Sequence, residues 1–541
     1  MLAAWLFKMQ VDKLIKMNIS HKTGFFISFF LILFVLSWHT ITILDLSPED
    51  RRETAFSDDS FYYLGPALNI AQGNGPTADG ITKTNGFHPL WMGILVVTAF
   101  VTGFNPDVLF DLSLVLGALF CLGAGALLYR IAAAYLPPIW AIVWSVFFIS
   151  GTALGLSTSG KEAPLIIFLI TALLWVEIKW REKNIYPYVL GTLLGLIFLA
   201  RTDAAFFLIG WFFFEAISIY LKENQLLAVV KNLLLPGLIV IFFASIWFGL
   251  SYYAYGTITQ SSGEMKKLWR PENVSQLTET MTGLKNWLRG FQNYSGQNII
   301  LLLLIGLVSI SVFKAKKSFD MTNFFSNYRP LVITIFSLSV YFILAGGYYA
   351  TKFWSLKVAP EWYYGHAILG VIFIGILITS FLLKHDELFL KSQWFVMGLL
   401  IFSIFYGAGK NVFFRNYDEV RESKEDGEIL RIAEYIDANL PDSVVIGSFN
   451  SGMLQYYTKH AVINLDGLNN IDIPEVYKNR AYDSYFKKRH ITYIADFENQ
   501  IPHNQVNYGI SSFAHLTEVY SVPCTTRWNG GNRIVLWKLP E

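Results

Sequence analysis

Long apolar runs that alternate with short basic clusters constrain this chain more than any other feature of its sequence. Twelve runs stand out, at residues 24–44, 89–103, 108–129, 138–156, 163–178, 188–200, 204–221, 233–252, 297–313, 331–347, 366–383 and 393–409. A helix needs roughly 20 apolar residues to cross a hydrocarbon core about 30 Å thick. Most of these runs therefore predict transmembrane helices. Charged residues make up only 15% of the chain, which excludes a single soluble fold.

Charge divides the chain into two parts. Residues 412–541 hold 13 of the 42 Lys and Arg residues and 17 of the 40 Asp and Glu residues. We expect a transmembrane module over 1–411 and a soluble domain over 412–541. A helix-like stretch from Glu419 to Asn439 precedes apolar, strand-like runs at Val444–Phe449, Ala461–Leu465, Ile491–Ala495 and Ile534–Leu539. This alternation predicts an α/β domain.

Basic clusters between the apolar runs predict the orientation in the membrane. Cytoplasmic positions are predicted for Lys8, Lys13, Lys16, Lys22, Lys179, Arg181, Lys183, Lys222, Lys231, Lys314, Lys316, Lys317, Arg329, Lys384 and Lys391. The N-terminus is then cytoplasmic, whereas the loop 45–88, the turn around Arg201, the segments 254–296 and 348–365, and the domain 412–541 are extracytoplasmic. We expect this arrangement in the cytoplasmic (inner) membrane. Twelve simple crossings would return the domain 412–541 to the cytoplasm, which contradicts the predicted orientation. We therefore expect 11 or 13 crossings, and the short run 89–103 is a candidate re-entrant segment.

Composition also excludes some functions. A formal net charge of +2 gives no sign of nucleic-acid binding. Cys121 and Cys524 are the two cysteines, too few for a disulfide framework. No nucleotide-binding glycine motif follows a strand-like run, which argues against a nucleotide-sugar enzyme.

The first outer loop holds the most reactive group of residues. It contains Asp58-Asp59, then Tyr62-Tyr63, and ends in Thr84-Asn85-Gly86-Phe87-His88-Pro89-Leu90-Trp91. One of two adjacent carboxylates is suited to act as general base on an acceptor hydroxyl. The other would then bind a cation, hold the acceptor or shift the pKa of the first carboxylate. The alternative is a helix N-terminus, where Ser57 or Asp58 is the N-cap and Asp59 lies favourably at the positive end of the helix dipole.

These motifs together resemble the first extracytoplasmic loop of the GT-C superfamily of integral-membrane glycosyltransferases. The similarity is strongest to the bacterial branch that includes protein O-mannosyltransferase-like and aminoarabinose-transferase-like enzymes. Less specific matches lie at Ser159-Gly160-Lys161-Glu162, Leu199-Ala200-Arg201-Thr202-Asp203, Tyr255-Gly256 to Ser262-Gly263 with Lys266, and Asn464-Leu465-Asp466-Gly467-Leu468-Asn469-Asn470. Two departures are Lys161, where an apolar residue is expected, and the absence of a Trp-Trp-Asp motif.

The resemblance implies a multi-pass α-helical, GT-C-like module with an active site facing away from the cytoplasm. It implies a polyprenyl-phosphate-linked sugar donor, a catalytic role for Asp58 with Asp59, and a match of His88 to a His-Pro position. Tyr62 and Tyr63 would help to position substrate. No strong metal-ligand spacing is present, so no cofactor is assigned and a divalent metal at Asp58 and Asp59 stays open.

Charged residues near the outer ends of the apolar runs are candidates for donor binding. A leaving phosphate needs cationic stabilisation, which makes Arg201 and Lys161 phosphate-binding candidates and Glu162 and Asp203 positioning candidates. The alternatives for Arg201 are a structural pair with Asp203 or Glu162, or snorkelling to the interface. Lys266 and Lys352 are expected to be solvated loop charges. Trp362 and Tyr363 are expected to belong to an interfacial aromatic belt, and the alternative is that their rings stack on a sugar.

The sequence therefore predicts a cell-envelope glycosyltransferase that moves a sugar from a polyprenyl-phosphate donor to an extracytoplasmic glycan, lipid or protein acceptor, with inversion at the anomeric carbon. A transporter or flippase for a lipid-linked saccharide is the alternative, and its polar residues would line a path near the midplane of the membrane. A third possibility is a membrane-anchored protein whose soluble domain binds envelope glycan through Asn464 and Asp466, although Asn-Leu-Asp-Gly is also a common turn composition.

Overall fold

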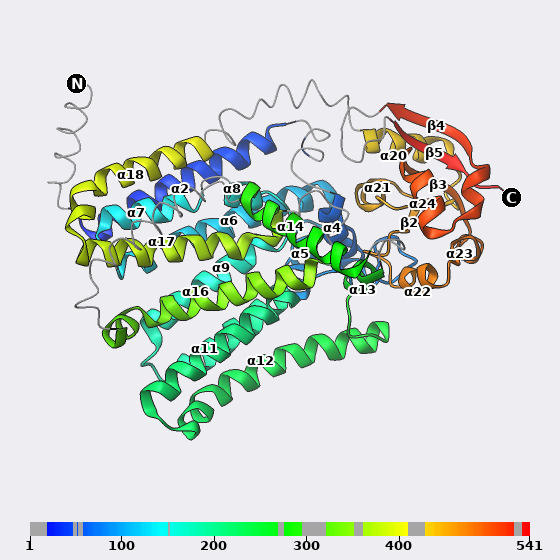
Figure 1. Cartoon of the computed structure of the whole chain (residues 1–541). Coiled ribbons are helices and arrows are strands. Elements are labelled where there is room, and N and C mark those ends of the chain that lie inside the picture. The colour runs from blue at the N-terminus through cyan, green and yellow to red at the C-terminus, as the bar shows by residue number, and fades with distance from the viewer. Residues whose placement is uncertain are drawn as a thin grey trace, which may run out of the picture.

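The computed structural model describes residues 19–46, 51, 58–149, 152–268, 275–294, 321–350, 361–408, 428–523 and 533–540. These residues form a bundle of apolar helices with an α/β domain at one end, beside α4, α5 and α13 (Figure 1). We call the bundle the membrane module and the α/β part, from Glu428 onward, the tail domain.

The helices of the membrane module follow one another along the chain with short connections. The first are α2 (His21–Leu44), α4 (Asp58–Ala71), α5 (Pro89–Val101), α6 (Pro106–Ala133), α7 (Pro138–Phe147), α8 (Thr152–Ser157), α9 (Ala163–Trp180) and α10 (Tyr186–Ala200). They are followed by η1 (Thr202–Ala204), α11 (Ala205–Glu223), α12 (Leu226–Tyr255), α13 (Ser261–Leu268), α14 (Gln276–Tyr294), α16 (Met321–Ala350), η2 (Glu361–Tyr363), α17 (Gly365–His385) and α18 (Glu387–Ala408).

Seven of the described helices are long and apolar enough to cross a membrane, and four shorter apolar helices accompany them. Eleven of the twelve predicted runs are thus helical in the structure, although 138–156 is divided between α7 and α8. The run 297–313 lies outside the described residues. Helix α5 has 13 residues, or about 20 Å of helix, too short for a simple crossing. The number of crossings stays a prediction.

A buried ion cluster joins helices at the end of the bundle away from the tail domain. Arg181 on the end of α9 pairs with Glu177 at 2.9 Å and with Glu215 on α11, and Arg329 on α16 pairs with Glu215 at 2.9 Å. The Tyr186 hydroxyl donates to Glu177 at 2.7 Å. Buried carboxylates need such partners. Two of the arginines predicted to mark the cytoplasmic side, Arg181 and Arg329, therefore hold helices together.

The tail domain is a five-stranded sheet with helices on both faces. Its strands are β1 (Val445–Ser448), β2 (Ala461–Asn464), β3 (Ile491–Phe497), β4 (Thr517–Pro523) and β5 (Arg533–Lys538), in the order β2-β1-β3-β5-β4. Strands β2, β1 and β3 are parallel, and β5 and β4 continue the sheet antiparallel. Its helices are α20 (Glu428–Asn439), α21 (Gly452–Tyr457), α22 (Ile473–Lys478), α23 (Tyr482–Arg489) and α24 (Gln500–Tyr508), followed by the turn η4 (Ser511–His515).

Alternation along the strands produces two separate apolar cores. In β5, Ile534 and Leu536 face the core under α20 and α21, whereas Val535 and Trp537 face the core on the opposite side. Successive strand residues point to opposite faces, so one sheet supports both layers. The predicted α/β domain and its four predicted strands are confirmed. Strand β4 was missed, because it lies at an edge and has several exposed residues.

Candidate active site

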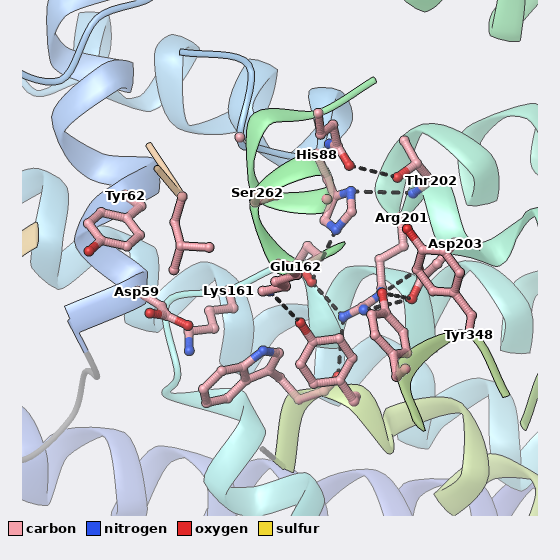
Figure 2. Close-up of a pocket in the computed structure, with 18 of the residues that line it drawn as sticks. Asp59, Tyr62, His88, Lys161, Glu162, Arg201, Thr202, Asp203, Ser262 and Tyr348 are labelled. Atoms are coloured by element: carbon pink, nitrogen blue, oxygen red, sulfur yellow. Dashed lines mark hydrogen bonds and ion pairs between the residues drawn. The ribbon is translucent and has the colours of Figure 1, made fainter. Parts of the chain in front are cut away.

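A cavity of about 280 Å³ lies where the membrane module meets the tail domain. It is lined by the start of α4, the loop ending in His88, the turn before α9, the α10–α11 junction, α13, the end of α16, η2 and one tail loop (Figure 2). The lining residues are Asp59, Tyr62, Tyr63, Gly86, His88, Lys161, Glu162, Arg201, Thr202, Asp203, Ala205, Phe206, Gln260, Ser262, Gly263, Lys266, Tyr348, Tyr349, Trp362, Tyr363 and Leu468.

Arg201 is the centre of a buried ion network in this cavity. Helix α10 ends at Ala200, and the extended backbone of Arg201 separates it from η1 and α11. Its guanidinium binds Asp203 through two hydrogen bonds of 3.0 and 2.9 Å and Glu162 through one of 2.7 Å. It also donates to the Trp362 carbonyl oxygen at 3.3 Å. Both structural pairs considered from the sequence are therefore present, and Arg201 is already committed to protein partners.

Asp203 also accepts hydrogen bonds from helix α16. The hydroxyls of Tyr341 and Tyr349 on α16 donate to its two carboxylate oxygens at 3.0 and 2.9 Å. Together with Arg201, these contacts fix the α10–α11 junction against α16. Asp203 thus acts on the cavity by holding Arg201 and the tyrosines in place.

His88 and Tyr63 complete the surroundings of Glu162. The Tyr63 hydroxyl donates to Glu162 Oε2 at 2.9 Å, and His88 Nε2 lies 3.9 Å from Glu162 Oε1. His88 Nδ1 accepts the Thr202 backbone N–H at 3.3 Å, which puts the ring proton on Nε2. Burial lowers the pKa of His88, so the ring is neutral near pH 7. Burial by itself raises the pKa of Glu162, but Arg201 outweighs it and the pKa stays below its usual value.

The turn that carries Lys161 and Glu162 is held by the first outer loop. The Ser60 hydroxyl donates to the Ser159 carbonyl at 2.8 Å, and the Trp91 indole donates to the Gly160 carbonyl at 3.1 Å. Gly160 has a φ of +67°, a conformation that favours glycine. The two sequence motifs, far apart along the chain, are thus parts of one structure.

Two lysines bring positive charge to the cavity. Lys161 is buried, and its ammonium lies 2.9 Å from the centre of the Trp362 ring. Lys266 on α13 donates to the Tyr363 hydroxyl at 3.0 Å. Burial by itself lowers the pKa of Lys266, but Tyr363 and Asp59 outweigh it, so the side chain stays protonated. The prediction that Lys266 is a solvated loop charge is therefore wrong, and Lys352 lies outside the described residues.

The aromatic residues of η2 line the cavity instead of forming an interfacial belt. Trp362 and Tyr363 lie in the cavity wall together with Tyr348 and Tyr349 from the end of α16. The Tyr349 and Tyr363 ring centres are 4.7 Å apart. The tyrosines of α16 were not singled out in the sequence, since nothing in their spacing separates them from other helix residues. Thr202 and Gln260 stand inside the motifs at 199–203 and 255–263, but no role was assigned to either.

Asp58 and Asp59 take different positions. Asp58 Oδ1 and Oδ2 accept the backbone N–H groups of Met453 at 2.8 Å and Gly452 at 3.0 Å, at the start of α21. Asp59 lines the cavity and has no hydrogen bond or ion pair with the described part of the chain. Successive helical residues are rotated by about 100°, which turns two adjacent carboxylates toward different surroundings. The structure therefore does not bring Asp58, the predicted base, into the cavity.

Tyr62 connects the cavity to the tail motif. Its hydroxyl accepts a hydrogen bond from the Asn464 side chain at 3.3 Å, while Asn464 also accepts the Gly467 N–H at 2.9 Å. Asp466 accepts the Leu468 N–H at 2.8 Å and does not line the cavity. Asn464 and Asp466 thus shape the turn that carries Leu468 into the cavity wall.

The described residues offer no ready metal site. No group of three or more His, Cys, Asp or Glu side chains in this part of the chain is arranged to hold a metal ion. The divalent ion considered for Asp58 and Asp59 gains no support from their positions, since Asp58 already accepts two backbone N–H groups.

The fold matches known structures of two membrane transferases. With the apo oligosaccharyltransferase of Archaeoglobus fulgidus, the TM-score is 0.53 at 11% identity, over 97% of this chain and 77% of that one. With apo ArnT from Cupriavidus metallidurans, it is 0.50 at 12% identity, over 96% of this chain and 98% of that one. The chain has the GT-C fold. A second Archaeoglobus fulgidus structure, AglB with an inhibitory peptide and a dolichol-phosphate, gives 0.52 at 11% identity over 96% and 76%.

Comparison of the sequence with known families gives a match to only part of the chain. A family described as a domain of unknown function (DUF8728) matches residues 415–536, a range that includes most of the tail domain. No curated protein matches the sequence. The apolar helices and the GT-C fold make the chain an integral membrane protein.

Proposed function

We propose that this GT-C chain transfers a sugar from a polyprenyl-phosphate-linked donor to an acceptor hydroxyl, with Asp59 as general base. One observation carries the proposal: Asp59 is the cavity carboxylate that lacks a partner among the described residues. Glu162 and Asp203, the other two carboxylates in the cavity wall, are bound to Arg201. A general base must be free to accept the proton of its substrate.

The reaction is a single displacement. The acceptor oxygen forms a bond to the anomeric carbon as its proton passes to Asp59. The bond between that carbon and the phosphate oxygen breaks, and the polyprenyl phosphate leaves with the electron pair. The sugar product therefore has the inverted configuration at the anomeric carbon.

Lys161 and Lys266 are the cations that we assign to the leaving phosphate. Both line the cavity: the Lys161 ammonium lies over the Trp362 ring, and Lys266 donates to the Tyr363 hydroxyl. An ammonium group in the cavity wall can form a charge-assisted hydrogen bond to a phosphate oxygen and offset the negative charge that develops as the phosphate leaves. Arg201 takes a positioning role instead of the phosphate contact predicted from the sequence, since its guanidinium donates four hydrogen bonds to Glu162, Asp203 and Trp362.

The remaining wall suits a sugar ring. Trp362, Tyr348, Tyr349 and Tyr363 offer apolar ring faces together with hydroxyl groups, a combination that buries the apolar face of a pyranose while satisfying its hydroxyls. His88, which burial keeps neutral and which accepts the Thr202 backbone N–H, is placed to orient a sugar or acceptor hydroxyl. The position of the cavity at the end of the bundle that carries the tail domain lets a lipid tail stay in the bilayer while its phosphate reaches the site. An AglB structure that contains a dolichol-phosphate shows that a protein of this fold accepts such a lipid.

The proposal is tested with purified protein in sealed vesicles that contain undecaprenyl-phosphate-linked hexoses or pentoses, radiolabelled in the sugar. Membranes from cells that lack this chain supply the acceptor. We expect label to move to the acceptor without net movement of lipid-linked sugar across the vesicle membrane, and we expect D59N to abolish this transfer. Movement of the lipid across the bilayer without transfer would instead support the flippase alternative.

A further inference from the structure

The contact between Asp58 and the tail domain is unusually close for two parts of a chain that are nearly four hundred residues apart. A methyl group added to Gly452 would lie 2.3 Å from the Asp58 carbonyl oxygen and 2.9 Å from its Oδ1. Gly452 does not have a positive φ, so nothing in the backbone of the tail domain itself requires glycine. Glycine is needed here because the N-terminal end of α21 rests on the backbone of α4.

A second close contact joins the tail domain to the loop that leads to His88. A methyl group on Gly86 would lie 2.1 Å from the Leu468 carbonyl oxygen. That same oxygen accepts the Ser261 hydroxyl at 3.2 Å, and the Ile471 N–H donates to the Lys83 carbonyl at 3.2 Å. The tail loop is thus seated on the loop that leads to His88, and it supplies Leu468 to the cavity wall.

Further contacts hold α21 against the membrane module. The Tyr456 hydroxyl donates to the Pro106 carbonyl at 2.7 Å, and the Tyr456 and Phe61 ring centres are 5.3 Å apart. Asp58 brings a carboxylate to this interface, and its two oxygens accept two of the backbone N–H groups that α21 leaves without helical partners. Hydrogen bonds to an ionised group are stronger than those between neutral groups.

We infer that Asp58 is a positioning residue: it clamps α21 so that the tail domain closes one side of the cavity, while Asp59, the next residue of α4, faces the substrate. The tail domain is then a structural part of the site, and its position against the membrane module depends on Asp58, Gly452 and Gly86. The inference deepens the proposed function and rests on it for the activity that the clamp supports.

Hydrogen exchange in the full-length protein, embedded in lipid nanodiscs, tests the clamp independently of any enzymatic assay. We expect D58A to speed exchange of the Gly452 and Met453 amides by at least about tenfold, the factor for losing one hydrogen bond to a charged group. G452A should do the same while leaving both aspartates intact, and D58N, which keeps one acceptor oxygen, should fall between D58A and the wild type. D59N and G93A should leave these amides unchanged, because Gly93 lies on α5 with open space around it.

The transfer assay then links the clamp to the cavity. We expect D58A and G452A to lower turnover several-fold with measurable residual transfer, D58N to recover part of the loss, and G93A to match the wild type. Unchanged exchange in D58A, or wild-type transfer by G452A despite faster exchange, would overturn the inference. If the wild type transfers no sugar from any lipid-phosphate donor, the proposed function fails, and the exchange measurements alone decide whether Asp58 clamps the tail domain.

Discussion

Replacing Arg201 by Met should destabilise the protein strongly, because it leaves two buried carboxylates without their cation. Arg201 binds Asp203 twice and Glu162 once, and all three side chains are less than a tenth exposed. Breaking a buried ion pair from one side costs about 3–5 kcal/mol, since the remaining charge stays desolvated. The tyrosine hydroxyls that bind Glu162 and Asp203 offset only part of this cost. We therefore expect R201M to lower the free energy of unfolding by about 3–5 kcal/mol.

The matched control is the triple variant R201M/E162Q/D203N, which removes the charges together. It should recover more than half of the lost stability, because no uncompensated charge remains in the cavity wall. Denaturant titration of the purified protein in detergent, followed by tryptophan fluorescence, measures both variants against the wild type. An R201M variant within about 1 kcal/mol of the wild type, or a triple variant no more stable than R201M, would refute the assigned network.

Three further predictions concern charge and the tail domain. K266A should lower kcat/KM for the lipid-phosphate donor by about 10–100-fold, whereas K267A, an exposed neighbour on α13, should leave it unchanged; equal effects would remove Lys266 from the site. Burial raises the pKa of Asp58 to about 6, so the folded state binds a proton that the unfolded chain has released, and stability should fall as pH rises from about 4 to about 6. D58N should flatten that decline in a pH series of melting temperatures, and an unchanged slope would contradict the assignment. N464A should loosen the tail loop, seen as about two- to tenfold faster exchange of the Gly467 amide, the range for one hydrogen bond to a neutral group, and unaltered exchange would show that Asn464 is dispensable.

Much of the fold could be predicted from the sequence, since periodic apolar runs and charge clusters are local signals. Helices α2, α6 and α12 follow directly from runs of sufficient length. The same signals do not show where a helix breaks inside a run, as between α7 and α8, because tertiary packing decides this. Strand β4 escaped for a related reason: an edge strand lacks the buried alternation that identifies its neighbours.

The site could be predicted only as a set of motifs. Asp59, His88, Lys161, Glu162 and Arg201 do line one cavity, although they come from four separate elements. Their individual roles depend on contacts that no spacing reveals. The sequence treated two adjacent aspartates alike, and only the position of α21 shows that one of them binds the tail domain.

Aromatic and basic residues in outer segments were the hardest to interpret. Trp362 and Tyr363 have the composition of an interfacial belt, and Lys266 that of a solvated helix. Their place in the cavity follows from the packing of η2 and α13 against the α10–α11 junction and the end of α16, which are distant contacts along the chain.

Single-turnover transfer from undecaprenyl-phosphate-linked sugar, compared between D59N and D58N, tests the central claim most directly. The two substitutions make the same chemical change at adjacent residues of one helix. We predict that D59N lowers the rate by about 10²–10⁴-fold, the contribution typical of a general base, while D58N keeps at least about a tenth of the wild-type rate because it loses one hydrogen bond at the tail domain. A D59N variant with the wild-type rate, or a D58N variant as inactive as D59N, would contradict the account.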